Sequence, residues 1–171
     1  TSYSTSNRIM LPFYVYYSMF GFQRVGDLAW AAGDLQARGF LLGGTSGRTT
    51  LNGEGLQHED GHSHILAATI PNCVSYDPSF AHEVGVIMHH GLKRMVEKQE
   101  NVFYYLTLLN ENYAQPGLSA GTEEEIIQGM YLLQRAAPAA KPELSVNLLG
   151  SGSILRESIA AQQLLADDWG V

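Results

Sequence analysis

The chain has few of the features that mark several common protein classes. Its 171 residues contain one cysteine, Cys73, so an intrachain disulfide is excluded and a reducing compartment is favoured. Lys and Arg number 10 against 17 Asp and Glu, giving a formal net charge of −7. A nucleic-acid-binding face needs clustered cations, so the sequence predicts no nucleic-acid partner. No apolar run approaches a membrane span and no signal-peptide pattern is present, so we expect no membrane partner and a cytoplasmic location.

The chain is long enough for one domain and part of a second, and its hydrophobic fraction of 45% supports a real core. It begins without methionine in the polar run "TSYSTSNR" and stops at "DDWGV", where a helix has just ended. From these two ends we expect a fragment of a longer protein.

Strand and helix patterns alternate over the first two thirds of the chain. Apolar, aromatic and β-branched runs predict strands, the first and last of them buried, at 9–17, 39–44, 72–77 and 101–109. Apolar residues at helical spacing predict helices at 22–37, 63–70 and 80–95. In the first of these helices the apolar positions are Val25, Leu28, Ala29, Ala32 and Leu35.

This alternation predicts an α/β fold, a parallel sheet with helices on both faces. Ligands of such sheets bind beyond the carboxyl ends of the strands. The polar, glycine-rich loop at 45–62 follows a strand and is expected at that edge.

The last third of the chain predicts the opening of a second α/β domain. A Pro-, Gly- and Glu-containing stretch at 110–125 is typical of a linker, and strand-like runs follow at 129–136 and 144–153. A helix is expected at 153–168, with Ser153 as its N-cap. The "GSGS" before it resembles a phosphate loop but lacks the Lys-Ser/Thr of that motif, so a tight strand-to-helix turn is favoured.

The run "HEDGH" at 58–62 matches the H-E-x-x-H signature of zinc metalloproteases. That signature works on a helix, where His58 and His62 would lie one turn apart and share a metal ion. Gly61 and Asp60 disfavour a helix here, and no third ligand has an obvious spacing. A zinc hydrolase remains a weak alternative to a polar loop without a metal.

Four runs closely resemble the homodimeric, bacterial type of pyruvate dehydrogenase, the thiamine-diphosphate-dependent, decarboxylating first component of the pyruvate dehydrogenase complex. They are residues 13–65, from "FYVYYSMFGFQRVGD" to "GLQHEDGHSHI", "PNCVSYDPSFAHEV", "KQENVFYYLTLLNENY" and "LLGSGSILRE". The resemblance implies a transketolase-like architecture. Residues 1–115 would be most of the pyrimidine-binding domain, 116–121 a linker and 122–171 the start of the C-terminal domain.

The resemblance also implies roles for three side chains. Phe20 resembles the aromatic residue that stacks on the aminopyrimidine of the cofactor, and Tyr17 and His58 resemble the active-site tyrosine and histidine of the family. From the residues alone, core packing would be favoured for both aromatics. The ligands of the Mg²⁺ and the diphosphate, and the family's catalytic glutamate, are expected outside this chain, so no metal ligand is predicted within it.

The resemblance implies a parent enzyme that decarboxylates pyruvate with thiamine diphosphate and Mg²⁺. It would reductively acetylate the lipoyl group of the dihydrolipoamide acyltransferase, act as a homodimer, and bind the lipoyl and subunit-binding domains of that acyltransferase. A second hypothesis is that the isolated chain is a non-catalytic structural or interaction module.

Overall fold

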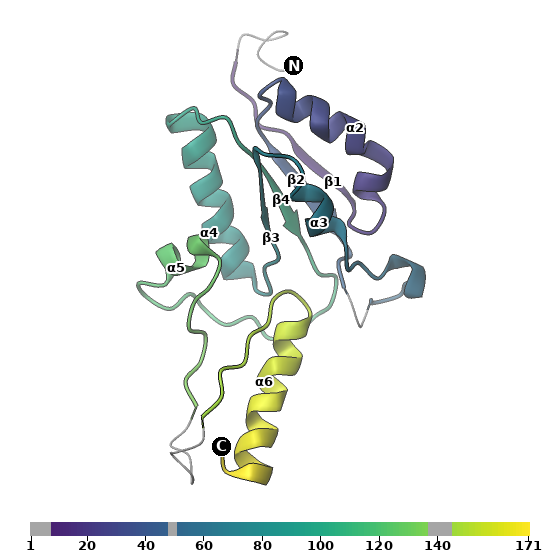
Figure 1. Ribbon diagram of the computed structural model, residues 1–171. Coiled ribbons are helices and arrows are strands. Elements are labelled where there is room, and N and C mark those ends of the chain that lie inside the picture. The colour runs from purple at the N-terminus through teal and green to yellow at the C-terminus, as the bar shows by residue number, and fades with distance from the viewer. Residues whose placement is uncertain (1–7, 48–50, 137–144) are drawn as a thin grey trace.

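The computed structural model describes residues 8–47, 51–136 and 145–171, and its centre is a four-stranded, fully parallel sheet (Figure 1). The strands are β1 (Phe13–Tyr17), β2 (Phe40–Gly44), β3 (Cys73–Tyr76) and β4 (Phe103–Thr107). Their order across the sheet is β1-β2-β4-β3. All four predicted strands are present, although each is shorter than its apolar run.

Helices cover both faces of this sheet, which confirms the predicted α/β class. Figure 1 shows α2 (Gly21–Asp34) and α3 (Ser63–Ala67) on one side and α4 (Ala81–Leu92) on the other. A 3₁₀ turn, η1 (Leu56–His58), lies in the loop between β2 and α3. A π-helical turn, η2 (Lys93–Glu97), extends α4.

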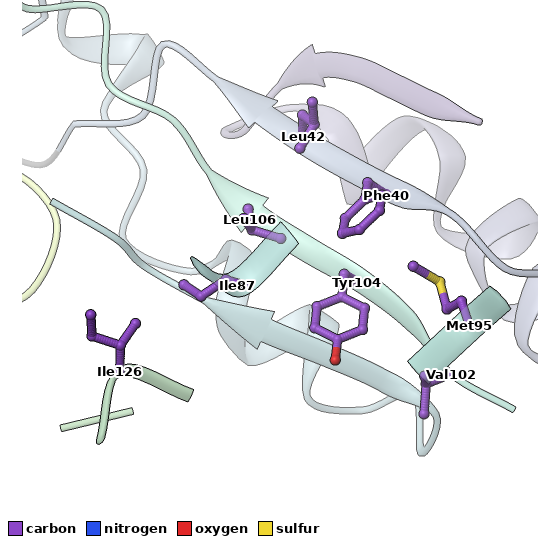
Figure 2. Close-up of a cluster of buried hydrophobic side chains, with 8 residues drawn as sticks. All are labelled: Phe40, Leu42, Ile87, Met95, Val102, Tyr104, Leu106 and Ile126. Carbon is purple, nitrogen blue, oxygen red and sulfur yellow. The ribbon is translucent and has the colours of Figure 1, made fainter. Parts of the chain in front are cut away.

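Strand β4 carries the centre of the core, since all five of its residues are buried. Side chains alternate across a strand, so Tyr104 and Leu106 face α4, whereas Phe103 and Tyr105 face α2 and α3. Figure 2 shows the α4 side of this core. Its buried members are Phe40, Leu42, Ile87, Met95, Val102, Tyr104, Leu106 and Ile126.

Two expectations about burial are wrong. The composition of the first apolar run predicts a buried strand, yet β1 is an edge strand and Val15 is 64% exposed. Of the apolar positions predicted for the helix at 22–37, Leu28 in α2 and Leu35 just after it are exposed, and the buried residues of α2 are Gly21, Phe22 and Ala29. The backbone of α2 is non-helical at Val25, so a single helical face drawn through the whole segment does not describe it.

The last third of the chain contains helices without strands among its described residues. They are α5 (Glu123–Gln128), α6 (Ile154–Leu164) and a π-helical turn, η3 (Leu165–Trp169). Residues 129–136 and 145–153, predicted to be strand-like, do not pair with any described strand. The first residue of the second predicted run, Leu144, lies outside the described residues. A strand needs a neighbour to pair with, and the described residues supply none here. Helix α5 begins inside the predicted linker because Ile126 is buried against α4.

We predict that Leu106→Ala lowers the free energy of unfolding of the chain by about 2–5 kcal/mol, because it leaves a cavity at a fully buried position of β4. Leu35→Ala, the same change at a side chain that is 80% exposed, should stay within about 0.5 kcal/mol. Urea unfolding of both variants measures the difference, and equal effects would contradict the assignment of β4 as the core strand.

Candidate functional site

The candidate site lies at the carboxyl ends of β1 and β2, the edge at which parallel α/β sheets bind ligands. The register pairs Tyr17, the last residue of β1, with Gly44, the last residue of β2. The amide of Ser18 continues this pairing by donating to the carbonyl of Gly44 at 3.1 Å. The chain therefore leaves both strands at the same edge, β1 into the turn that carries Phe20 and β2 into the loop that carries His58.

The three residues with predicted roles come together at this edge. The His58 ring lies 5.3 Å from the Tyr17 ring and 5.2 Å from the Phe20 ring, centroid to centroid. The Tyr17 and Phe20 rings meet edge to face at 6.5 Å. About forty residues of sequence separate Tyr17 from His58, so only the parallel pairing of β1 with β2 brings them into contact.

Tyr17 and Phe20 also line a pocket of about 470 Å³, whose other walls include Tyr14, Arg24 and Thr45. The guanidinium of Arg24 lies 4.9 Å from the centroid of the Phe20 ring, a cation–π contact. Gly21 keeps the turn close to the strand, since the nearest atoms of the Tyr16 ring would lie 1.6 and 1.8 Å from a Cβ placed there. The pocket thus offers aromatic surface and one cation, a combination that suits a planar, polarisable ligand.

Glu54 is a member of the site that the sequence did not indicate. Its Oε2 lies 3.8 Å from Nε2 of His58, four residues later in the chain, and both side chains are largely buried. Neither the Oε2 of Glu54 nor the Nδ1 of His58 has a hydrogen-bond partner among the described residues. The i,i+4 spacing is visible in the sequence but predicts a contact only on a helix, and these residues form a loop ending in one 3₁₀ turn.

The "HEDGH" run begins at His58, the last residue of η1, and continues as a loop up to α3, so it lacks the helix that the zinc interpretation requires. His58 contacts Glu54, whereas the Nε2 of His62 lies 3.1 Å from the side-chain amide of Gln23 on α2. Among the described residues no cluster of three or more His, Cys, Asp or Glu could hold a metal ion. The geometry therefore does not support a zinc hydrolase.

The buried member of this run is Asp60, which is 4% exposed. Its Oδ1 accepts hydrogen bonds from the amides of His62 at 3.1 Å and Ser63 at 3.0 Å, and its Oδ2 accepts one from the Ser63 hydroxyl. Burial raises the pKa of the Asp60 carboxyl, but these hydrogen bonds outweigh burial and hold the pKa below its usual value.

A second polar group lies at the carboxyl ends of β3 and β4. Asp77 accepts hydrogen bonds from the Thr107 hydroxyl at 2.5 Å and the Ser151 hydroxyl at 2.8 Å, and the Nε2 of His64 lies 3.1 Å from the Thr107 oxygen. The "GSGS" run forms a turn before α6, as predicted, but the strand expected in front of it is absent among the described residues. Gly152 has a positive φ (51°), and Oδ1 of Asp77 would lie only 2.6 Å from a Cβ placed there, so both features require glycine.

Comparison with known proteins assigns the family. Residues 1–116 match the family model described as the pyruvate dehydrogenase E1 component middle domain. The chain belongs to this pyruvate dehydrogenase E1 family. Its architecture, a parallel four-stranded sheet between helices, is that of a transketolase-like α/β domain.

Several curated relatives, each named as a pyruvate dehydrogenase E1 component, align with all or nearly all of this chain. The Escherichia coli (strain K12) protein is 66% identical over 172 residues, and the Pseudomonas aeruginosa protein is 63% identical over 171. The Haemophilus influenzae protein is 63% identical over 171 residues, 99% of the chain. In each case the chain spans 19%, about a fifth, of the length of the relative. No helix in the described part of the chain is long and apolar enough to cross a membrane.

We predict that Asp60→Asn lowers the free energy of unfolding at neutral pH by about 1–3 kcal/mol, because the amide replaces one of two buried acceptor oxygens with a donor. The folded-state pKa of Asp60 is depressed, so its carboxylate stabilises the fold fully above the unfolded value of about 3.9 and loses that effect as pH falls through the lower folded value. The difference from the unsubstituted chain should therefore shrink in acid.

Urea unfolding of both proteins at neutral pH and at about pH 3 measures this difference. Glu59→Gln serves as the control, since it removes the neighbouring carboxylate, for which no hydrogen bond is seen among the described residues. A difference that grows in acid would show that the Asp60 carboxylate does not stabilise the fold.

Proposed function

We propose that the chain is part of a thiamine-diphosphate-dependent pyruvate dehydrogenase, and that residues at the carboxyl edge of β1 and β2 form one side of its active site. The contact of His58 with both Tyr17 and Phe20 carries this proposal. Membership of the E1 family and the names of the curated relatives support pyruvate as the substrate.

The pocket fits one part of the proposed cofactor. Its walls of Tyr14, Tyr17 and Phe20 suit the flat face of an aminopyrimidine, which aromatic side chains bind by offset stacking. As the resemblance to the family implies, we propose that the Mg²⁺ and the diphosphate are held by residues outside this chain. When bound, thiamine diphosphate supplies the electron sink for the carbanion left by loss of carbon dioxide.

The residues of this chain would orient the reactants and donate a hydrogen bond or a proton to the substrate. Phe20 and Tyr17 would hold the aminopyrimidine ring. His58, with an imidazole that can give or accept a proton near neutral pH, would donate a hydrogen bond or a proton on the substrate side. The carboxylate of Glu54 lies 3.8 Å from the His58 Nε2, so it flanks the ring and would help to hold its orientation. The surrounding aromatic side chains would limit the access of water.

We further propose the assembly and reaction of the whole enzyme. It would reductively acetylate the lipoyl group of the dihydrolipoamide acyltransferase, bind the lipoyl and subunit-binding domains of that protein, and act as a cytoplasmic homodimer. Within this chain we propose residues 1–115 as the pyrimidine-binding domain, 116–121 as a linker and 122–171 as the start of the C-terminal domain. The end of the family match at residue 116 supports this division.

In the full-length enzyme, we predict that His58→Ala lowers turnover of pyruvate by about 10²-fold or more, the loss expected for a positioned proton donor or acceptor. Cofactor affinity should change much less. Phe20→Ala should affect cofactor binding more than turnover, and it should raise the apparent Kd of thiamine diphosphate more than His58→Ala does. Steady-state kinetics with a dye acceptor, combined with cofactor titration, separates the two effects.

His62→Ala and His64→Ala are the matched controls for this experiment, and both should lower turnover less than His58→Ala. His62 lies against Gln23 and His64 lies against Thr107, away from the two aromatic rings of the site. Near-normal turnover in His58→Ala, with loss in either control, would refute the role of His58. An enzyme that accepts only a different 2-oxo acid would refute the substrate.

A second hypothesis is that the chain by itself is a non-catalytic module. The exposure of the edge strand β1 favours this hypothesis. Phe13, Tyr14, Val15 and Tyr17 of β1 are about half exposed or more, as expected of a strand that further polypeptide covers. We predict that the isolated chain neither binds thiamine diphosphate tightly nor decarboxylates pyruvate. Calorimetric titration with cofactor and Mg²⁺ is the measurement, and micromolar binding would disprove the prediction.

A further inference from the structure

We infer that Asp60 is a positioning residue for His58: its buried carboxylate fixes the loop that holds the His58 ring against Tyr17 and Phe20. This inference rests on the proposed function, because Asp60 would affect catalysis only through His58, a residue of the proposed active site. Asp60 is not itself placed to touch a ligand, since it is buried and does not line the pocket.

The Asp60 side chain ties the loop to helix α3. Three donors converge on the carboxylate: the amides of His62 and Ser63 and the hydroxyl of Ser63. These bonds join the end of the loop to the first turn of α3, where Ser63 is itself buried. A buried carboxylate is costly unless its oxygens are satisfied, so this position tolerates an acid because the three donors are in place.

The Asp60 backbone ties the same point of the loop to the segment that follows β2. Its amide donates to the carbonyl of Gly47 at 2.8 Å, three residues beyond the end of β2. A further contact comes from His62, whose Nε2 lies 3.1 Å from the Gln23 amide on α2, the helix that follows Phe20. Asp60 is therefore anchored to α3 and to the segment that follows β2, and its neighbour His62 contacts α2.

His58 is two residues upstream of this anchor, at the end of the 3₁₀ turn. The amides of His58 and Glu59 donate to the carbonyls of Gly55 and Leu56, both at 3.0 Å, which makes the turn a short, closed unit. Leu56 of this unit is exposed. Upstream, the loop is anchored at Asn52, which exchanges two hydrogen bonds with the Asn110 side chain, and downstream it is anchored at Asp60. His58 is six residues from the first anchor and two from the second, so we infer that Asp60 does most to set the direction in which the turn presents His58.

The alternative is that Asp60 only stabilises the start of α3. The two roles differ in how Asp60 and His58 combine. If Asp60 acts through His58, removing its carboxylate costs turnover only while His58 is present. If Asp60 only stabilises the fold, the two changes add, as independent sites do.

The test is a double-mutant cycle in the full-length enzyme, with His58→Ala, Asp60→Ala and the double variant assayed on pyruvate. Asp60→Ala should lower kcat by about 10- to 100-fold, the cost of misplacing a reacting group by about 1 Å. In the His58→Ala background the same change should alter kcat less than about twofold. Glu59→Gln is the matched control and should keep kcat within about twofold. Asp60→Asn retains an acceptor for the backbone amides and replaces Asp60→Ala in the cycle should the alanine variant not fold.

Crystal structures of the unsubstituted and Asp60-substituted enzymes provide a readout that does not depend on activity. The His58 ring should leave its contacts with Tyr17 and Phe20 while Phe20 itself stays in place. Unchanged His58 geometry, an unchanged kcat, or an equal loss of kcat in both backgrounds would each overturn the inference. An unsubstituted enzyme that does not turn over pyruvate would instead refute the proposed function, and the structural comparison would still decide the role of Asp60.

Discussion

The parallel pairing of β1, β2 and β4 is the constraint on which the rest of the structure depends. In register, Tyr17 lies beside Gly44, and Gly43 lies beside Thr107, so three strands end at one edge. Each strand that ends there is followed by a loop that carries polar or aromatic side chains. A shift of one residue would turn every side chain of a strand to the other face of the sheet. The site therefore depends on the register of β1 with β2, and β2 is in turn paired with the fully buried strand β4.

Burial on both faces also explains why parts of the fold could be predicted from the sequence. The run that becomes β4 is apolar without alternation, as a strand covered on both faces requires. Ile87 of α4 and Met95 of η2, the turn that extends α4, lie at helical spacing. The edge strand β1 has the same composition, yet it is exposed because no described strand lies beyond it. Composition indicates that a segment is able to be buried, and tertiary neighbours decide whether it is.

The site could be predicted only in part, for the same reason. Tyr17, Phe20 and His58 were indicated by resemblance, and no local pattern relates residues about forty positions apart. Glu54 and Asp60 were not indicated by any signal. An acid in a glycine-rich loop is usually solvated, and only the folded structure shows that Glu54 faces His58 and that Asp60 is enclosed by three donors.

The run at 58–62 shows that backbone conformation decides the chemistry of a set of side chains. On a helix, its two histidines would face the same way and the glutamate between them could serve a shared metal. Here the 3₁₀ turn ends at His58 and α3 starts at Ser63, so the two imidazoles are directed to different partners, Glu54 and Gln23. Gly61 between them disfavours a helix. The acid that becomes buried is Asp60, and its short side chain reaches the amides two and three residues ahead, as aspartate does in turns and helix caps. The same five residues thus form a loop that holds one histidine, His58, against Tyr17 and Phe20, two of the rings that line the pocket.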